Sequence, residues 1–144
     1  MVKVFLDTNF FLRFILEDHD QSKQCIELVE AIDRSVCTPY TSSIVFLELN
    51  YVLTSPRIYQ FSKKKSLRMI TQLQKMRNLV LIEDMNFDRA LEIYAKTNIK
   101  LGDCVIASQV PEDVLFCSFD KDFLKIKNMQ VYTPSQILEL FVNE

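Results

Sequence analysis

Four acidic residues stand next to or inside apolar segments, where an isolated carboxylate is costly. They are Asp7, Glu48, Asp103 and Asp120. Two of them follow strand-like apolar runs, and the other two lie in or at the start of apolar helical segments. Carboxylate oxygens are the ligands that Mg²⁺ and Mn²⁺ prefer, and such ions polarise phosphates and activate water. The pattern therefore predicts metal-dependent hydrolysis of phosphodiester bonds.

Glu48 is the most informative of the four, because its surroundings are apolar. Its neighbours at helical spacing are Ile44, Val45, Tyr51 and Val52. A carboxylate on such a stripe is at least partly buried and needs a metal, a proton or a cationic partner. The alternative to a catalytic role is a structural salt bridge to an arginine or lysine.

The other three acids also have structural alternatives. Asp7 and Asp103 each precede a predicted helix and are suitable N-caps. Asp120 suits a turn, and Asp122 stands two residues later. Gly102 favours a functional Asp103, because glycine allows a tight backbone turn and leaves the carboxylate accessible. The recurrence of an acid at two strand ends and on two helices favours one shared site.

Strands and helices are expected to alternate along the chain. Apolar runs predict strands at residues 2–6, 36–38, 79–82, 114–117 and 131–132. Helical periodicity predicts helices at residues 10–16, 20–34, 44–53, 62–76, 87–96, 104–109 and 135–141. Because parallel neighbours need helical crossovers, we expect an α/β class fold, a three-layer α/β/α sandwich around a mostly parallel sheet of about five strands.

Composition indicates one globular domain over residues 1–144, with 49% hydrophobic and 25% charged residues. Four cysteines without C-x-x-C spacing are expected to be buried free thiols: Cys25, Cys37, Cys104 and Cys117. They favour a reducing setting. The N-terminal apolar run is too short for a signal peptide, and no run reaches the roughly 20 apolar residues of a membrane span, so a cytoplasmic location is expected.

Several function classes are excluded by single residues. With Gly102 as the only glycine, the chain has no glycine-rich loop for a nucleotide cofactor. The only histidine, His19, lies in a polar loop, which excludes catalysis by a histidine pair or triad. Asn9 stands where haloacid-dehalogenase phosphatases carry a second aspartate, which argues against that class of phosphatase. A net charge of −2 argues against a simple DNA-coating protein.

Four short motifs together resemble the PIN-domain family, specifically the toxin ribonucleases of VapBC-type toxin–antitoxin pairs. They are Phe-Leu-Asp-Thr-Asn at residues 5–9, Glu48 in its apolar helix, Gly-Asp-Cys-Val-Ile-Ala at 102–107 and Ser-Phe-Asp-Lys-Asp-Phe at 118–123. The resemblance spans nearly the whole chain. It implies an α/β/α fold, Mg²⁺- or Mn²⁺-dependent endoribonuclease activity, frequent homodimers and inhibition by a small antitoxin protein.

The resemblance also implies residue roles. Asp7 and Asp103 would be the principal metal ligands, and Glu48 and Asp120 would complete the acidic site. Ser118 would support it.

Two further positions carry implied roles. Asn9 would orient Asp7, and Asp122 would share or replace the role of Asp120. Cys104 departs from the family's usual alanine, and residues 110–113 shorten the following helix and its loop.

Substrate and partner contacts are less specified. Lys63, Lys64, Lys65 and Arg68 would hold RNA, although such a run equally suits a solvated helix face. Phe10, Phe11, Phe14 and Ile15 exceed what one helix needs for its inner face, which predicts a homodimer. The alternatives are a non-catalytic interaction module and a structure-specific DNA nuclease, since no motif reads a 2′-hydroxyl.

Overall fold

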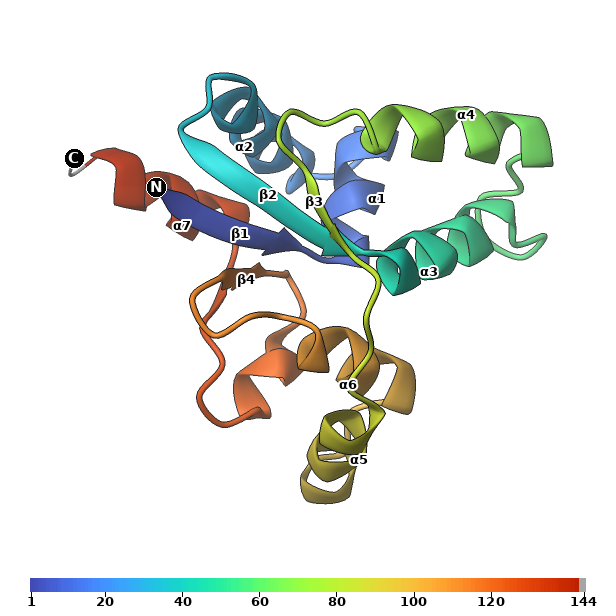
Figure 1. Ribbon diagram of the computed structural model, residues 1–144. Coiled ribbons are helices and arrows are strands. Elements are labelled where there is room, and N and C mark those ends of the chain that lie inside the picture. Colours follow the sequence, from blue (N-terminus) through green and yellow to red (C-terminus); the bar gives the residue numbers. More distant parts are fainter. Residues whose placement is uncertain (143–144) are drawn as a thin grey trace.

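A computed structural model describes residues 1–142 and contains a five-stranded parallel sheet (Figure 1). The strand order is β3-β2-β1-β4-β5, and every neighbouring pair is parallel. The strands are β1 (Val2–Leu6), β2 (Cys37–Ser42), β3 (Val80–Ile82), β4 (Leu115–Cys117) and β5 (Val131–Tyr132).

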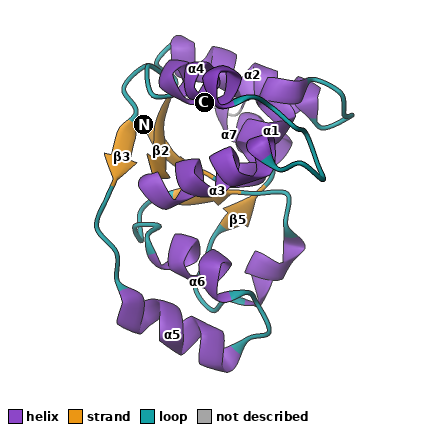
Figure 2. Ribbon diagram, turned by 90° about the vertical axis from the view of Figure 1, so that its right-hand side faces the viewer, coloured by secondary structure: helices purple, strands orange, loops and turns teal. Residues whose placement is uncertain are grey.

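Helices cover both faces of the sheet, which confirms the predicted three-layer α/β/α fold. They are α1 (Thr8–Leu16), α2 (Ser22–Asp33), α3 (Ser43–Thr54), α4 (Lys63–Leu73), α5 (Phe87–Lys96), α6 (Leu101–Ser108) and α7 (Pro134–Val142), with one 3₁₀ turn, η1 (Lys121–Lys125). Helices α1 to α4 lie together on one side, whereas α5 and α6 pair on the other (Figures 1 and 2). Helix α7 returns to pack on α2.

The strand order reverses at the centre of the sheet. From β1 the chain moves outward through β2 to β3, and then crosses back to β4 and β5 on the other side of β1. In open parallel sheets, ligands bind outside the carboxyl ends of the strands where this reversal occurs. The crevice beyond the ends of β1 and β4 is therefore the expected site.

The central strand is buried on both faces, as a parallel sheet covered by helices requires. Val4, Phe5 and Leu6 have no exposed surface, and the Phe5 ring stacks on that of Phe116 in β4 at 5.7 Å between centroids. This packing fixes β1 rigidly against β4. The residues that immediately follow the two strands are therefore held close together.

The prediction that the apolar side chains of α1 form a homodimer surface is largely wrong. Phe10 and Phe11 on α1 are 0% and 1% exposed within the single chain, and Phe14 and Ile15 are partly buried against the same core. The central sheet and its neighbouring helices absorb more of α1 than the sequence suggests. Those four residues no longer argue for a second copy.

Among the element boundaries that differ from expectation, two lie near the site. Strand β2 continues through Pro39 to Ser42, whereas its predicted end is residue 38. Because β3 pairs with β2 only from Tyr40 onward, Pro39 has a strand neighbour on one side only, so its missing N–H is tolerated. Helix α6 begins at Leu101, three residues earlier than predicted.

All four cysteines are buried free thiols, as predicted. Burial raises the pKa of Cys25 and of Cys37 to about 12, so their reactive thiolate forms are suppressed. Within residues 1–142, no helix has the length and apolar character needed to cross a bilayer.

Candidate active site

Asp7 occupies the centre of the predicted site, directly after β1. Its side chain is buried, with 4% of the residue exposed. Its backbone N–H donates to the Cys117 carbonyl at 3.2 Å, which ties the end of β1 to the end of β4. Asp7 stands at the N-cap position of α1, but its carboxylate makes no capping hydrogen bond. The capping alternative therefore does not explain this buried charge.

Ser118 connects the two strand ends that carry acids. It follows β4, is buried, and donates from Oγ to Asp7 Oδ2 at 2.8 Å. The same Oγ accepts a hydrogen bond from the Asp120 backbone N–H at 3.1 Å. Its own backbone N–H donates to the Tyr132 carbonyl in β5 at 3.0 Å. Ser118 thus lies in contact with Asp7, and its supporting role in the site stays a prediction.

Glu48 lies half-buried on α3, which Ser42 caps by accepting from the Val45 N–H at 3.3 Å. Burial raises the pKa of the Glu48 carboxyl, and the charge of Asp103 raises it further, while Lys100 lowers it. The ion pairs within the described residues join Lys3 to Asp113 and Lys125 to Asp122, so none involves Glu48. The structural salt bridge that is the alternative for Glu48 is absent there.

Asp103 lies in the first turn of α6 rather than at its cap, because Lys100 is the N-cap residue. Burial raises the pKa of the Asp103 carboxyl, and the charges of Asp120 and Asp122 add to the effect. Gly102 is helical with no positive φ, and a Cβ there would meet no atom within 4 Å. The expectation of a tight turn at Gly102 is therefore wrong, although the space beside Gly102 is open.

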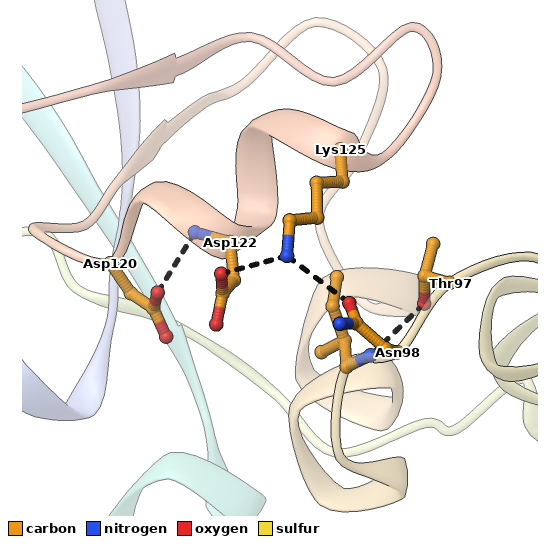
Figure 3. Close-up of polar contacts among 6 residues, drawn as sticks. Thr97, Asn98, Asp120, Asp122 and Lys125 are labelled. Carbon is orange, nitrogen blue, oxygen red and sulfur yellow. Dashed lines mark hydrogen bonds and ion pairs between the residues drawn. The ribbon is translucent and has the colours of Figure 1, made fainter.

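Asp120 and Asp122, which we call the rim acids, lie at the start of η1 (Figure 3). Asp120 caps η1 by accepting the Asp122 N–H at 2.9 Å, so the turn-forming role that suits it is present. Asp122 is exposed and pairs with Lys125 Nζ at 3.1 Å. Lys125 also donates to Asn98 Oδ1 at 3.1 Å, at the junction of α5 and α6. Of the two rim acids, Asp122 already has a cationic partner.

The electrostatics of the centre are those of crowded carboxylates. Burial is the main cause that raises the pKa of Asp7 to about 7, and the charges of Glu48 and Asp103 contribute. Hydrogen bonds from Ser118 and from the Thr8 backbone oppose this shift. The charges of Glu48 and Asp103 raise the pKa of Asp7, and that of Asp120 raises the pKa of Asp103, as expected for neighbouring carboxylates. The structure brings together the four acids that the sequence singles out.

The donor set fits a hard divalent cation. Within the described part of the chain, no three His, Cys, Asp or Glu side chains lie close enough together to hold a metal ion as they stand. The available donors are carboxylate oxygens, and Mg²⁺ typically binds few carboxylates and keeps several waters. Thr8 Oγ1 beside them is buried without a hydrogen-bond partner in residues 1–142, although it lies near enough to Glu48 to lower the pKa of that carboxyl. An ion with its waters would satisfy both the acids and this hydroxyl.

The sequence pattern assigns no catalytic role to Thr8 or Lys100. Thr8 suits a helix cap, yet it is the first residue of α1 and its hydroxyl is buried at the site. Lys100 is exposed but lowers the pKa of both Glu48 and Asp103. Their signals are weak: a threonine directly after Asp7, and a lysine shortly before Asp103.

Two other sets of predicted residues lie outside the cluster. Asn9 is exposed, and no hydrogen bond joins it to Asp7 among the described contacts. Helix α4 carries the basic run, Lys63, Lys64, Lys65 and Arg68, all exposed. Ser66 on α4 donates to Asn50 Oδ1 on α3 at 2.7 Å, and residues two apart on a helix point in nearly opposite directions. The run therefore lies across α3 from Glu48.

Comparison with known proteins agrees with the parallel α/β fold. The family model described as PIN domain matches residues 4–129. Since this covers most of the chain, the protein belongs to the PIN domain family, whose members are generally nucleases. Among curated proteins, no sequence matches significantly.

Solved structures with the same fold have low sequence identity to the chain. VapBC2 from Rickettsia felis, bound to a DNA fragment from its promoter, has a TM-score of 0.63 at 21% identity, over 92% of this chain and 98% of that one. VapBC-1 from nontypeable Haemophilus influenzae has a TM-score of 0.60 at 18% identity, over 94% and 99%. PAE2754 from Pyrobaculum aerophilum has a TM-score of 0.64 at 13% identity, over 99% and 91%.

Proposed function

We propose that this chain is a Mg²⁺- or Mn²⁺-dependent endoribonuclease and the toxin of a toxin–antitoxin pair. The observation that carries the proposal is the convergence of Asp7, Glu48, Asp103 and Asp120 at the reversal point of the sheet. Three of these carboxyls have raised pKa values, and none of those three has an ion-pair partner in the described residues. A scaffold gains nothing from collecting such charges, which disfavours the non-catalytic alternative.

The four acids would hold the ion, which supplies polarisation of the phosphate and activation of water when bound. Ser118 keeps one Asp7 oxygen in a fixed direction by its hydrogen bond, and leaves the other oxygen available. Lys100 offsets part of the negative charge at Glu48 and Asp103. Without a cation, the uncompensated acids repel RNA phosphates from the crevice. Asp122 contributes less than Asp120, because Lys125 already neutralises it.

The partners follow from the same proposal. Similarity to the VapBC structures supports a small antitoxin partner, and we propose that the protein acts on RNA in the cytoplasm. A homodimer is also proposed, but not through α1. The large exposed apolar side chains lie elsewhere, for example Leu47 and Tyr51 on α3, at 66% and 72% exposure. Light scattering at micromolar concentration measures the oligomeric state.

The deciding experiment incubates the purified protein with single-stranded and structured RNA and DNA, in Mg²⁺, Mn²⁺ or chelator. Cleavage of RNA that requires metal and is lost in Asp103→Asn supports the proposal. The matched control is Asp113→Asn, an exposed aspartate that precedes β4 at the other end of that strand and pairs with Lys3. Cleavage of DNA alone would favour a DNA nuclease, and no cleavage of either would favour an interaction module.

A further inference from the structure

A groove of about 670 Å³ lies between α5 and the segment that follows η1. Its lining includes four basic side chains, Arg89, Lys96, Lys125 and Lys127, and two acidic ones, Asp88 and Glu92. An adjoining hollow of about 400 Å³ shares Arg89 and Lys127 with it, so the two form one elongated surface.

Basic side chains outnumber acidic ones in this groove by four to two, and one of the four, Lys125, is paired with Asp122. Within the described residues, Arg89, Lys96 and Lys127 make no ion pair, and the whole chain carries a net charge of −2. A basic concavity on an acidic protein concentrates anions locally. The groove is thus suited to a polyanion.

The groove also adjoins the active-site rim. Lys125 lines the groove and at the same time contacts Asp122 and Asn98, each at 3.1 Å (Figure 3). Thr97, beside Asn98, lines the groove as well. The groove therefore begins at the end of η1, whose start carries Asp120 and Asp122.

We propose that this groove binds the sugar–phosphate backbone of the RNA strand on one side of the cleaved bond. This inference rests on the proposed function. An acidic protein partner fits less well, because protein interfaces are anchored by buried apolar side chains. The apolar residues of this lining, Ile93 and Ile126, are only 9% and 7% exposed. The side-chain amide N–H groups of Asn86 and Asn128 instead offer hydrogen bonds to phosphate oxygens.

The test measures binding separately from cleavage. A labelled single-stranded RNA of about 12 nucleotides, within the usual site size of single-strand binders, is titrated with the Asp103→Asn protein in chelator. Adding Arg89→Gln and Lys127→Gln is expected to weaken binding about tenfold and to lower the salt slope by about 0.7 for each phosphate that is no longer neutralised. The matched control adds Lys23→Gln and Arg34→Gln, one lysine and one arginine exposed on and just after α2, and is expected to bind like the parent.

Each outcome separates the two proposals. If the wild-type protein neither binds nor cleaves RNA, the proposed function fails. If it cleaves RNA with metal but the groove variant binds like the control, the inference alone is wrong. If replacing Lys63 and Lys64 removes binding and the groove substitutions do not, the RNA strand lies on α4 and the groove inference is wrong. An acidic peptide such as polyglutamate that competes as well as RNA would also overturn it.

Chain length gives a second measure that a general charge effect does not reproduce. A dinucleotide held at the acidic site is expected not to reach along the groove, so the groove substitutions are expected to leave its cleavage unchanged. An equal loss for the dinucleotide and the longer strand would contradict a backbone subsite. Melting temperatures of the variants confirm that the substitutions, all at exposed positions, leave the fold intact.

Discussion

The buried centre and the exposed rim of the site treat their carboxylates in opposite ways. At the centre, Asp7 is 4% exposed and receives a hydrogen bond from Ser118, but no cation pairs with it in the described residues. At the rim, the Asp122 side chain is 59% exposed and pairs with Lys125. The rim acid is an ordinary surface ion pair. Asp7, by contrast, has no cationic partner although it is buried, where an unpaired carboxylate is most costly.

The difference shows where the fold is under strain in the absence of a ligand. Burial raises the pKa of Asp7 to about 7 from an ordinary 3.8. At about 1.4 kcal/mol for each pH unit, this corresponds to a cost on the order of 4 kcal/mol for holding the charged form. Exposed pairs like that at the rim contribute about 0–1 kcal/mol. A cost of that size at a crevice is typical of a functional site.

The largest expected effect is that of Asp103→Asn at the centre. It removes a charged donor from the crevice, and we expect RNA cleavage to fall more than about 100-fold, the upper end for loss of a residue that only orients a metal ligand. The metal-free protein is expected to gain up to about 1 kcal/mol, because repulsion by the other acids is relieved. The gain is small because a first-turn carboxylate also interacts favourably with the start of α6.

Thermal melts with chelator and with Mn²⁺ check this prediction. Added Mn²⁺ should stabilise the wild type by mass action and leave Asp103→Asn unaffected. A variant destabilised equally in both conditions, with cleavage retained, would mean that Asp103 is only structural.

The next effect concerns pH and Asp7. Its folded-state pKa lies above the unfolded value, so the folded state binds the proton more tightly. Its stabilising contribution is therefore complete below about pH 4 and is lost as pH rises to about 7. Chemical denaturation of the metal-free protein across this range should show a loss of up to about 4 kcal/mol that Asp7→Asn removes. Equal slopes for the two proteins would show that Asp7 is not desolvated.

An intermediate effect is expected for Ser118→Ala, which leaves every acid in place. The Ser118 hydrogen bond lowers the pKa of Asp7, so its loss should move the acidic limb of the pH–rate profile upward. Metal affinity should fall about 10- to 100-fold, as for other residues that orient a ligand. Ser118→Thr, which keeps the hydroxyl, is the control. If both variants behave like the wild type, the 2.8 Å contact does not orient Asp7.

Much of the fold follows from the sequence because its signals are local. Apolar runs followed by helical periodicity place all five strands within a few residues, and β5 occupies the predicted residues 131–132. The burial of the α1 side chains is not predictable in this way. Whether Phe10 and Phe11 face a second copy or the core depends on how closely the other helices pack, and one helix's periodicity does not contain that information.

The sequence predicts the acidic residues of the site, but not the residues that act on them. Apolar neighbours mark Glu48, and strand ends mark Asp7 and Asp120, because burial and the carboxyl edge follow from the pattern. Asn9 stands beside Asp7 in sequence but is exposed. Lys100 acts on Glu48 across a distance of 52 positions, a tertiary relation that no local motif shows.

The smallest expected effects separate the two rim acids. Asp120 accepts the Asp122 N–H, has no cation partner among residues 1–142, and is the neighbouring charge that most raises the pKa of Asp103. Asp122 is neutralised by Lys125. We therefore expect Asp120→Asn to lower cleavage and Mn²⁺-induced stabilisation clearly, and Asp122→Asn to change both less than about threefold, within the range of an exposed ion pair.

Replacing Lys125 with Met removes the ion-pair partner of Asp122 and should slightly raise the affinity of the site for a cation. Measured by Mn²⁺ titration, that increase should vanish in the Lys125→Met, Asp122→Asn double variant, because the freed charge is then absent. If Asp122→Asn instead abolishes cleavage while Asp120→Asn does not, the contrast between a charged centre and a neutralised rim is wrong, and Asp122 is the fourth acid.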